Sequence, residues 1–134
     1  MTAVPPAPPE ALIEGVDLFN QGRWFEAHEV LEAAWLAEPG PERRLYQGLL
    51  QVGVGLHHAR RGNLAGALRL LERGMGLLRP FSPQSRGLDV AALLAAASTA
   101  RDRLAAPGGL EGFDWAQAPR ARFVGGAAGT GGPG

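Results

Sequence analysis

The chain has 134 residues, enough for one ordinary domain with a single apolar core, and its 13 basic residues balance 13 acidic ones. This balance argues against binding to nucleic acid or to an anionic membrane surface. The sequence contains no cysteine, which excludes disulfides, thiolate metal sites and a cysteine nucleophile, so any metal site must use His, Asp or Glu.

The N-terminal stretch "MTAVPPAPPEALIEG" lacks the basic start and apolar core of a signal peptide, and it predicts a cytoplasmic protein. The longest run without formal charge, residues 45–59, is shorter than the ~20 residues that span a bilayer. We expect a disordered proline-rich lead at 1–9, a helical domain at 10–106 and an irregular to disordered glycine-rich tail at 107–134. Phe113, Trp115 and Phe123 could hold parts of this tail against the helices.

Apolar residues at helical spacing predict five helices. The first two span about residues 10–20 and 24–37, and Gly22 separates them as a left-handed cap. "EPGP" at 38–41 ends the second helix, because proline cannot continue the hydrogen-bond ladder. Further helices are expected at 42–61, 64–78 and 89–104, with Asn63 as the N-cap of the fourth. No segment alternates as a half-buried strand does, so the fold is predicted to be all-α.

An internal similarity relates two of these helices. At an offset of 40 residues, "GRWFEAHEVLE" from Gly22 aligns with "GNLAGALRLLE" from Gly62. The spacing of glycine, bulky residue, alanine and leucine is close to that of tetratricopeptide hairpins, although those repeats have a shorter period. The predicted architecture is a compact bundle of about five helices built from two tetratricopeptide-like helical hairpins.

The stretch "EAHEVLEAAW", residues 26–35, carries a histidine and a glutamate where an apolar face is expected. On a helical wheel, His28 and Glu32 lie beside the core arc, and Phe25 and Leu36 extend the apolar surface on their far side. The pair is therefore predicted to face inward. A buried carboxylate must be protonated, hydrogen-bonded, paired with a cation or bound to a metal.

The next helix carries a polar stripe of Gln47, Gln51 and His58. Gly48 and Gly55 lie beside this stripe and would allow a neighbouring backbone to come close. Because the connection at 38–41 is short, the two helices are expected to be antiparallel neighbours. If the stripe faces the pair on the preceding helix, the two histidines, the glutamate and Gln51 converge.

Three interpretations of this constellation stay open. The first is a satisfied polar network in which His28, Glu32 and Gln51 hydrogen-bond to one another and fix the helix packing. The second is a site for one divalent ion, Zn, Mn or Fe, held by His28, Glu32 and His58. The third is a pocket without metal in which Glu32 acts as acid or base. The walls of such a pocket would be Trp24, Trp35, Gln47 and Gln51.

The segments "FNQGRWFEAHEVLEAAW" and "YQGLLQVGVGLHHARRGNLAGALRLLERG" resemble a known family over about residues 12–104. It is domain-of-unknown-function family 309, small bacterial and archaeal helical proteins with the pattern H-x-x-x-E-x-x-W/Y, here His28, Glu32 and Trp35. The resemblance implies an all-α fold and a suggested metal-binding role for the motif, and it brings no established activity. His58 corresponds to the second helical histidine of the family.

The sequence therefore predicts a small helical protein with a buried His/Glu site that binds a divalent metal, with hydrolysis as its suggested chemistry. The alternative is a helical protein-interaction module in which the network of His28 and Glu32 is only structural. The predicted partners exclude nucleic acid and membrane and leave open a small molecule or a protein. A homodimer could form through leftover apolar surface on the fifth helix or around Trp115.

Overall fold

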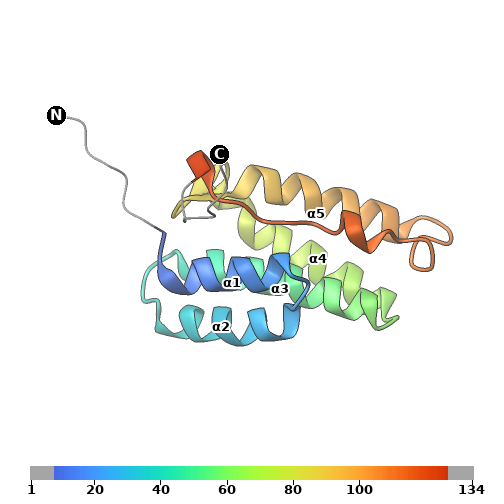
Figure 1. Cartoon of the computed structure of the whole chain (residues 1–134), viewed down its shortest axis with the longest axis horizontal. Helices are drawn as coiled ribbons and strands as arrows, with labels where there is room; N and C mark the ends of the chain where they lie inside the picture. The colour runs from blue at the N-terminus through green and yellow to red at the C-terminus, as the bar shows by residue number, and fades with distance from the viewer. Residues whose placement is uncertain (1–7, 127–134) are drawn as a thin grey trace.

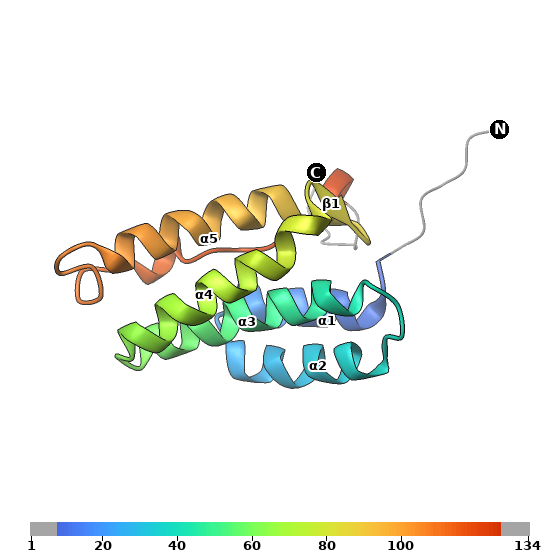
Figure 2. The same ribbon diagram turned by 180° about the vertical axis from the view of Figure 1, so that it is seen from behind.

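The computed structural model describes residues 8–126 and shows five α-helices that follow one another as antiparallel neighbours (Figures 1 and 2). Each helix packs on the next one along the chain. In both views α2 and α5 lie at opposite edges of the molecule, with the other helices between them. The helices are α1 (Glu10–Asn20), α2 (Trp24–Ala37), α3 (Arg43–Arg60), α4 (Leu64–Leu78) and α5 (Val90–Ala105).

The predicted all-α class is confirmed, and every helix begins and ends within one residue of its expected bounds. The turns explain this agreement. Gly22 and Gly62, which follow α1 and α3, have φ values of 74° and 86°, a backbone region that glycine enters without steric cost. Asn63 caps α4 as predicted, because its Oδ1 accepts a hydrogen bond of 3.0 Å from the N–H of Gly66. The likeness to tetratricopeptide hairpins stays a prediction.

The core is a single apolar cluster to which all five helices contribute. The glycines of α3 allow its close contact with α4, as the sequence indicated: a Cβ on Gly48 would lie 3.1 Å from the carbonyl oxygen of Gly74. A Cβ on Gly55 would lie 3.2 Å from the carbonyl oxygen of Ala67. The largest fully buried side chains are Leu12, Phe19, Leu31, Leu45, Leu49, Leu56, Leu71, Met75, Leu78, Leu88, Leu93 and Leu104.

A small hairpin between α4 and α5 was not predicted. The chain passes through the 3-10 turn η1 (Arg79–Phe81) and then pairs β1 (Gln84–Ser85) with β2 (Leu88–Asp89). Both residues of the connecting turn, Arg86 and Gly87, have positive φ, 50° and 83°, as a two-residue hairpin turn requires. The strands are too short to show the alternation by which a strand is recognised in a sequence.

After α5 the chain turns back and runs between α5 and α1 (Figure 1). This return segment, residues 113–124, includes the 3-10 turn η2 (Trp115–Gln117) and leads into η3 (Val124–Gly126). Phe113 and Phe123 are buried, and Trp115 packs on Trp24, so the three aromatic residues hold the segment against the helices. The expected disorder of residues 1–7 and 127–134 lies outside the described residues.

No helix within residues 8–126 combines the length and the apolarity needed to cross a membrane.

Candidate functional site

The predicted site pair lies on α2, one helical turn apart. His28 Nε2 is 4.0 Å from Glu32 Oε2, which places the two groups at the outer limit of an ion pair. The side chain of His28 is 32% exposed and that of Glu32 is 45% exposed. The expectation of a buried His/Glu site was therefore wrong. The fully buried residues of α2 are Trp24, Ala27 and Leu31, and His28 and Glu32 are only partly covered.

Two large apolar side chains flank the pair and are open to solvent. Phe25 is 61% exposed and Leu36 is 66% exposed. At 3.6 residues per turn, both lie within an arc of about 100° that also holds His28, Glu29 and Glu32. We call these five residues the α2 face. The sequence indicated that Phe25 and Leu36 extend the apolar surface around the pair, and the structure shows that this surface faces outward.

The polar stripe of α3 does not meet the pair. His58 turns to the α3–α4 connection, where its Nδ1 lies 3.4 Å from Asn63 Nδ2. Gln51 Oε1 is buried and has no hydrogen-bond partner in the described part of the chain. Gly53 marks the side of α3 that meets α1 and α2, since a Cβ there would contact Phe19 and Trp24. Gln51 and His58 lie about 140–160° around the helix from Gly53. The predicted convergence, and with it the hydrogen-bonded network, was wrong for this reason.

The metal and catalytic interpretations gain no support from this geometry. Within residues 8–126, no group of three or more His, Asp or Glu side chains is placed so that it could hold a metal ion. His28 and Glu32 supply two neighbouring donors, and His58 does not join them. Binding of Zn, Mn or Fe and acid–base chemistry by Glu32 stay predictions.

His57 lies beside the α2 face, although no role was predicted for it. Its ring centroid is 6.4 Å from that of Phe25, and its Nδ1 is buried with no hydrogen-bond partner from residues 8–126. Burial lowers the pKa of His57, and the positive charges of Arg60 and Arg61 lower it further. His57 follows Gly53 by four residues, so it lies within about 40° of Gly53 around α3, on the side that meets α1 and α2.

The predicted pocket walls do not surround one cavity. Trp24 is 3% exposed and lies at the start of α2, whereas Trp35 lies three turns later, about 16 Å along the helix. Trp35 is half-buried, and the guanidinium carbon of Arg43 lies 5.7 Å from its ring centroid. Gln47 and Gln51 belong to the stripe that faces away from α2. Trp24 instead contributes to a cavity on another side of the molecule.

The fold and the α2 face define an all-α protein of successive helical hairpins with a half-exposed His/Glu pair between two exposed apolar side chains. Residues 12–70 match the model of the family described as Domain of unknown function (DUF309). The match confirms the resemblance seen in the sequence. It contains His28, Glu32 and Trp35 and ends within α4.

One curated relative is the "Uncharacterized protein YpuF" of Bacillus subtilis (strain 168). It is 38% identical over 90 residues, which cover 64% of this chain and 52% of that protein. The chain thus matches about half the length of this relative.

Proposed function

We propose that this protein is a helical interaction module that binds a partner protein through the α2 face. The observation that carries the proposal is the exposure of Phe25 and Leu36, 61% and 66%. All other large apolar side chains within residues 8–126 are at least partly buried. Exposed apolar groups among polar neighbours are typical of protein interaction sites. The two side chains are separated by eleven residues, or about 16 Å along the helix.

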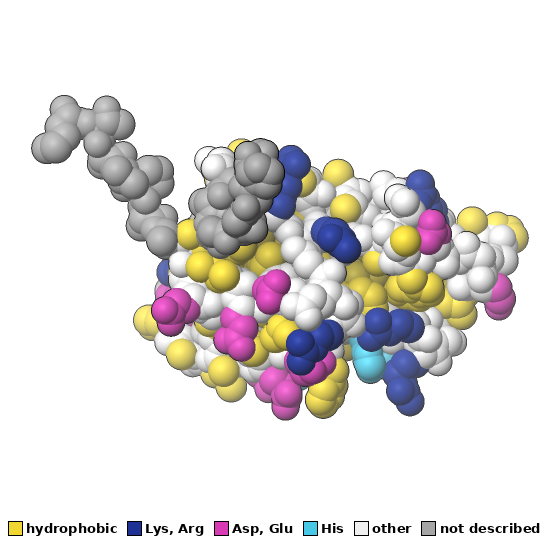
Figure 3. All heavy atoms as spheres, in the orientation of Figure 1, with side chains coloured by type: hydrophobic (Ala, Val, Ile, Leu, Met, Phe, Trp, Pro, Cys, Tyr) yellow, Lys and Arg dark blue, Asp and Glu magenta, His cyan; other side chains and the backbone are white. Residues whose placement is uncertain are grey.

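The charges of the α2 face indicate the chemistry of the partner. Glu29 and Glu32 lie between the two apolar side chains, and α2 contains no lysine or arginine. The remaining acid, Glu26, is already paired with Arg23 at 2.6 Å. Acidic side chains also lie over α1 and α2 in Figure 3, with apolar side chains between them. The complementary partner is a helix with two apolar side chains about three turns apart and Arg or Lys between them.

A second copy of the chain is a poorer occupant for this face. In an antiparallel pair of α2 helices, Phe25 of one copy meets Leu36 of the other. The same register places Glu29 of one copy opposite Glu32 of the other, and like charges in such a contact are unfavourable. The charge pattern therefore favours a basic partner over self-association.

The test is reconstitution of a complex with a purified partner. A partner isolated from the natural host is identified, purified and titrated against wild type and against a Phe25→Ser/Leu36→Ser variant. We expect the variant to lose at least about tenfold in affinity, or ~1.4 kcal/mol, while its free energy of unfolding changes by less than ~0.5 kcal/mol. Glu29→Lys/Glu32→Lys should weaken binding to a similar extent, and added salt should weaken the wild-type complex.

Glu10→Lys/Glu111→Lys is the matched control, since both acids are exposed and lie outside α2. This variant should bind as wild type does. An unchanged affinity in the Phe25→Ser/Leu36→Ser variant would overturn the proposal. The proposal would also be overturned if light scattering showed that wild type is a dimer and that the Phe25→Ser/Leu36→Ser variant is a monomer. The α2 face would then bind a second copy of the chain.

A further inference from the structure

A cavity of about 200 Å³ lies where the return segment crosses the α1–α2 turn. Four parts of the chain line it: the end of α1 with its turn, the start of α2, the end of α3, and residues 115, 116 and 118–120 of the return segment. The side chains used below are Trp24, Arg60, Trp115 and Arg120. The cavity is separate from the α2 face, none of whose five residues line it.

The cavity has cationic side chains and no acidic ones. Arg60 and Arg120 line it, and no Asp or Glu is among the residues that do. Neither guanidinium forms an ion pair with a carboxylate in the described part of the chain. Within residues 8–126, the positive charge at this site therefore lacks a counter-charge.

The guanidinium of Arg60 is held in a defined position. Its central carbon lies 4.3 Å from the ring centroid of Trp24, within cation–π distance. Its Nη1 lies 3.3 Å from the point that a Cβ on Gly22 would occupy, so the absence of a side chain at Gly22 makes room for it. Arg60 thus reaches over the α1–α2 turn and remains able to donate hydrogen bonds.

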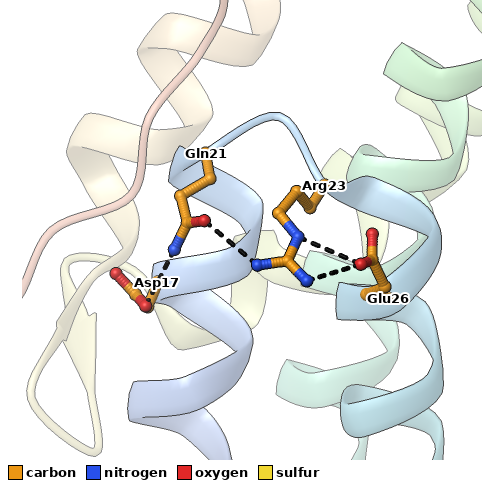
Figure 4. A network of polar contacts seen from close by, with 4 residues as sticks. All are labelled: Asp17, Gln21, Arg23 and Glu26. Carbon is orange, nitrogen blue, oxygen red and sulfur yellow. Dashed lines mark hydrogen bonds and ion pairs between the residues drawn. The ribbon is translucent and has the colours of Figure 1, made fainter.

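The nearby carboxylates are engaged elsewhere (Figure 4). Gln21 Nε2 donates to Asp17 Oδ2 at 2.9 Å, and Arg23 donates to Glu26 Oε2 from Nε at 3.0 Å and from Nη2 at 2.6 Å. Arg23 also donates to Gln21 Oε1 at 3.3 Å, which joins the two pairs across the turn. This network leaves Arg60 and Arg120 without acidic partners.

Two indole rings form apolar walls of the cavity. The ring centroids of Trp24 and Trp115 are 5.8 Å apart, and the planes meet at 51°. Phe113 holds Trp115 in an edge-on contact with centroids 4.7 Å apart. Trp24 Nε1 is a buried donor without a hydrogen-bond partner among residues 8–126. The walls suit a flat apolar body, and the two guanidinium groups suit a carboxylate, to which arginine can donate two parallel hydrogen bonds.

We infer that this cavity binds a small planar monocarboxylate, with its carboxylate at Arg60 and Arg120 and its flat body against Trp115, which is less buried than Trp24. The volume is below the roughly 300 Å³ at which sites for drug-sized ligands begin, so the ligand is of about the size of benzoate. The positive charges that depress the pKa of His57 include that of Arg60, which agrees with a positive potential at this end of α3.

Benzoate titration of the full-length wild-type protein tests the inference. Binding is followed by calorimetry and by tryptophan fluorescence, because two of the three tryptophans of the chain line the cavity. We expect saturable binding of benzoate at one site per chain, weaker binding of inorganic phosphate, and no binding of benzamide, which lacks the charge. Arg60→Gln and Arg120→Gln should each weaken benzoate binding at least about tenfold.

Arg61→Gln is the matched control, since Arg61 follows Arg60 in the chain, carries the same charge and does not line the cavity. It should leave the affinity unchanged. Thermal unfolding of each variant separates loss of binding from loss of folding, and Arg120→Gln changes an exposed residue of the return segment. Absence of saturable benzoate binding by wild type would overturn the inference. The inference would also fail if Arg61→Gln weakened benzoate binding as much as Arg60→Gln does, or if phosphate or benzamide bound as tightly as benzoate.

Discussion

At the scale of single residues, Asp89 joins three parts of the molecule. It ends β2 and caps α5, where its Oδ1 accepts a hydrogen bond of 2.9 Å from the N–H of Ala92. Its Oδ2 accepts one of 3.0 Å from Arg122 Nε in the return segment. Both interactions favour the charged carboxylate. The N–H of Ala92 has the larger effect, and together with Arg122 it lowers the pKa of Asp89.

We expect this carboxylate to make folding pH-dependent at acid pH. A lowered pKa in the folded state adds stability above the pKa of an unfolded aspartate, about 4, and this stability is lost as pH falls through the folded value. Asp89→Asn keeps an acceptor for the cap, so at neutral pH it should cost less than the ~1 kcal/mol expected of Asp89→Ala. Between pH 5 and 2, Asp89→Asn should lose less stability than wild type. Urea unfolding across this range measures both effects.

Asn63→Ala is the control, because Asn63 caps α4 without a charge. It should cost ~1 kcal/mol and leave the pH dependence as in wild type. If Asp89→Asn lost as much stability on acidification as wild type, a group other than Asp89 would cause the pH dependence.

At the scale of helices, glycines, which have no side chain, allow the close spacing of α3 and α4. A Cβ on Gly74 would lie 2.9 Å from the carbonyl oxygen of Gly48 and 2.9 Å from the backbone nitrogen of Val52. These are backbone atoms, which cannot turn aside as the end of a flexible side chain can. The contact therefore requires glycine for its lack of a side chain.

Gly74→Ala should lower the free energy of unfolding by about 2 kcal/mol, because overpacking of this contact outweighs the gain of ~1 kcal/mol in helix propensity. Gly76→Ala is the matched control two residues later in α4. Gly76 is exposed, and the nearest atom to its added Cβ would be Arg79 Nη1 at 3.8 Å. This variant should gain ~0.5–1 kcal/mol. Equal effects of the two substitutions in urea unfolding would show that the contact relaxes freely.

At the scale of the whole molecule, the return segment closes the space between α1 and α5. Asn20 pairs with the backbone of Ala121 through two hydrogen bonds of 2.8 Å, one donated and one accepted. Phe123 forms a β-bridge with Leu88 and is 7% exposed. The segment lies outside the family match at 12–70, yet it covers apolar surface of the helices and supplies one wall of the proposed carboxylate cavity.

Removal of the return segment should therefore destabilise the helices. A chain of residues 1–106 is expected to lose ~3 kcal/mol or more relative to the full chain, since burial of Phe123 alone is worth about this much. It should also bind a dye that recognises exposed apolar surface. Phe123→Ala in the full chain should reproduce most of the loss, whereas Arg120→Gln should change stability by less than ~0.5 kcal/mol. Unchanged unfolding of the 1–106 chain would contradict this view of the segment.

Local features of the sequence were sufficient to predict the helices. Gly22, Gly62 and Asn63 act on the residues next to them, and the prolines at 39 and 41 stop α2 within one turn, so their effects can be read without knowledge of the fold. The glycines of α3 were correctly assigned to a close contact. The short hairpin was missed, because its pairing depends on a turn at Arg86 and Gly87 that has no flanking strand pattern.

Which surfaces are covered depends on the tertiary structure. The helical wheel of α2 ordered its side chains correctly. Whether His28 and Glu32 are buried, however, depends on the position of α3. This helix turns Gly53 toward α2, while Gln51 and His58 face elsewhere. The pairing of Asn20 with Ala121 spans 101 positions in the chain. Helix periodicity extends over a few turns and specifies which residues share a face, whereas burial of that face requires a partner that only the folded chain brings into place.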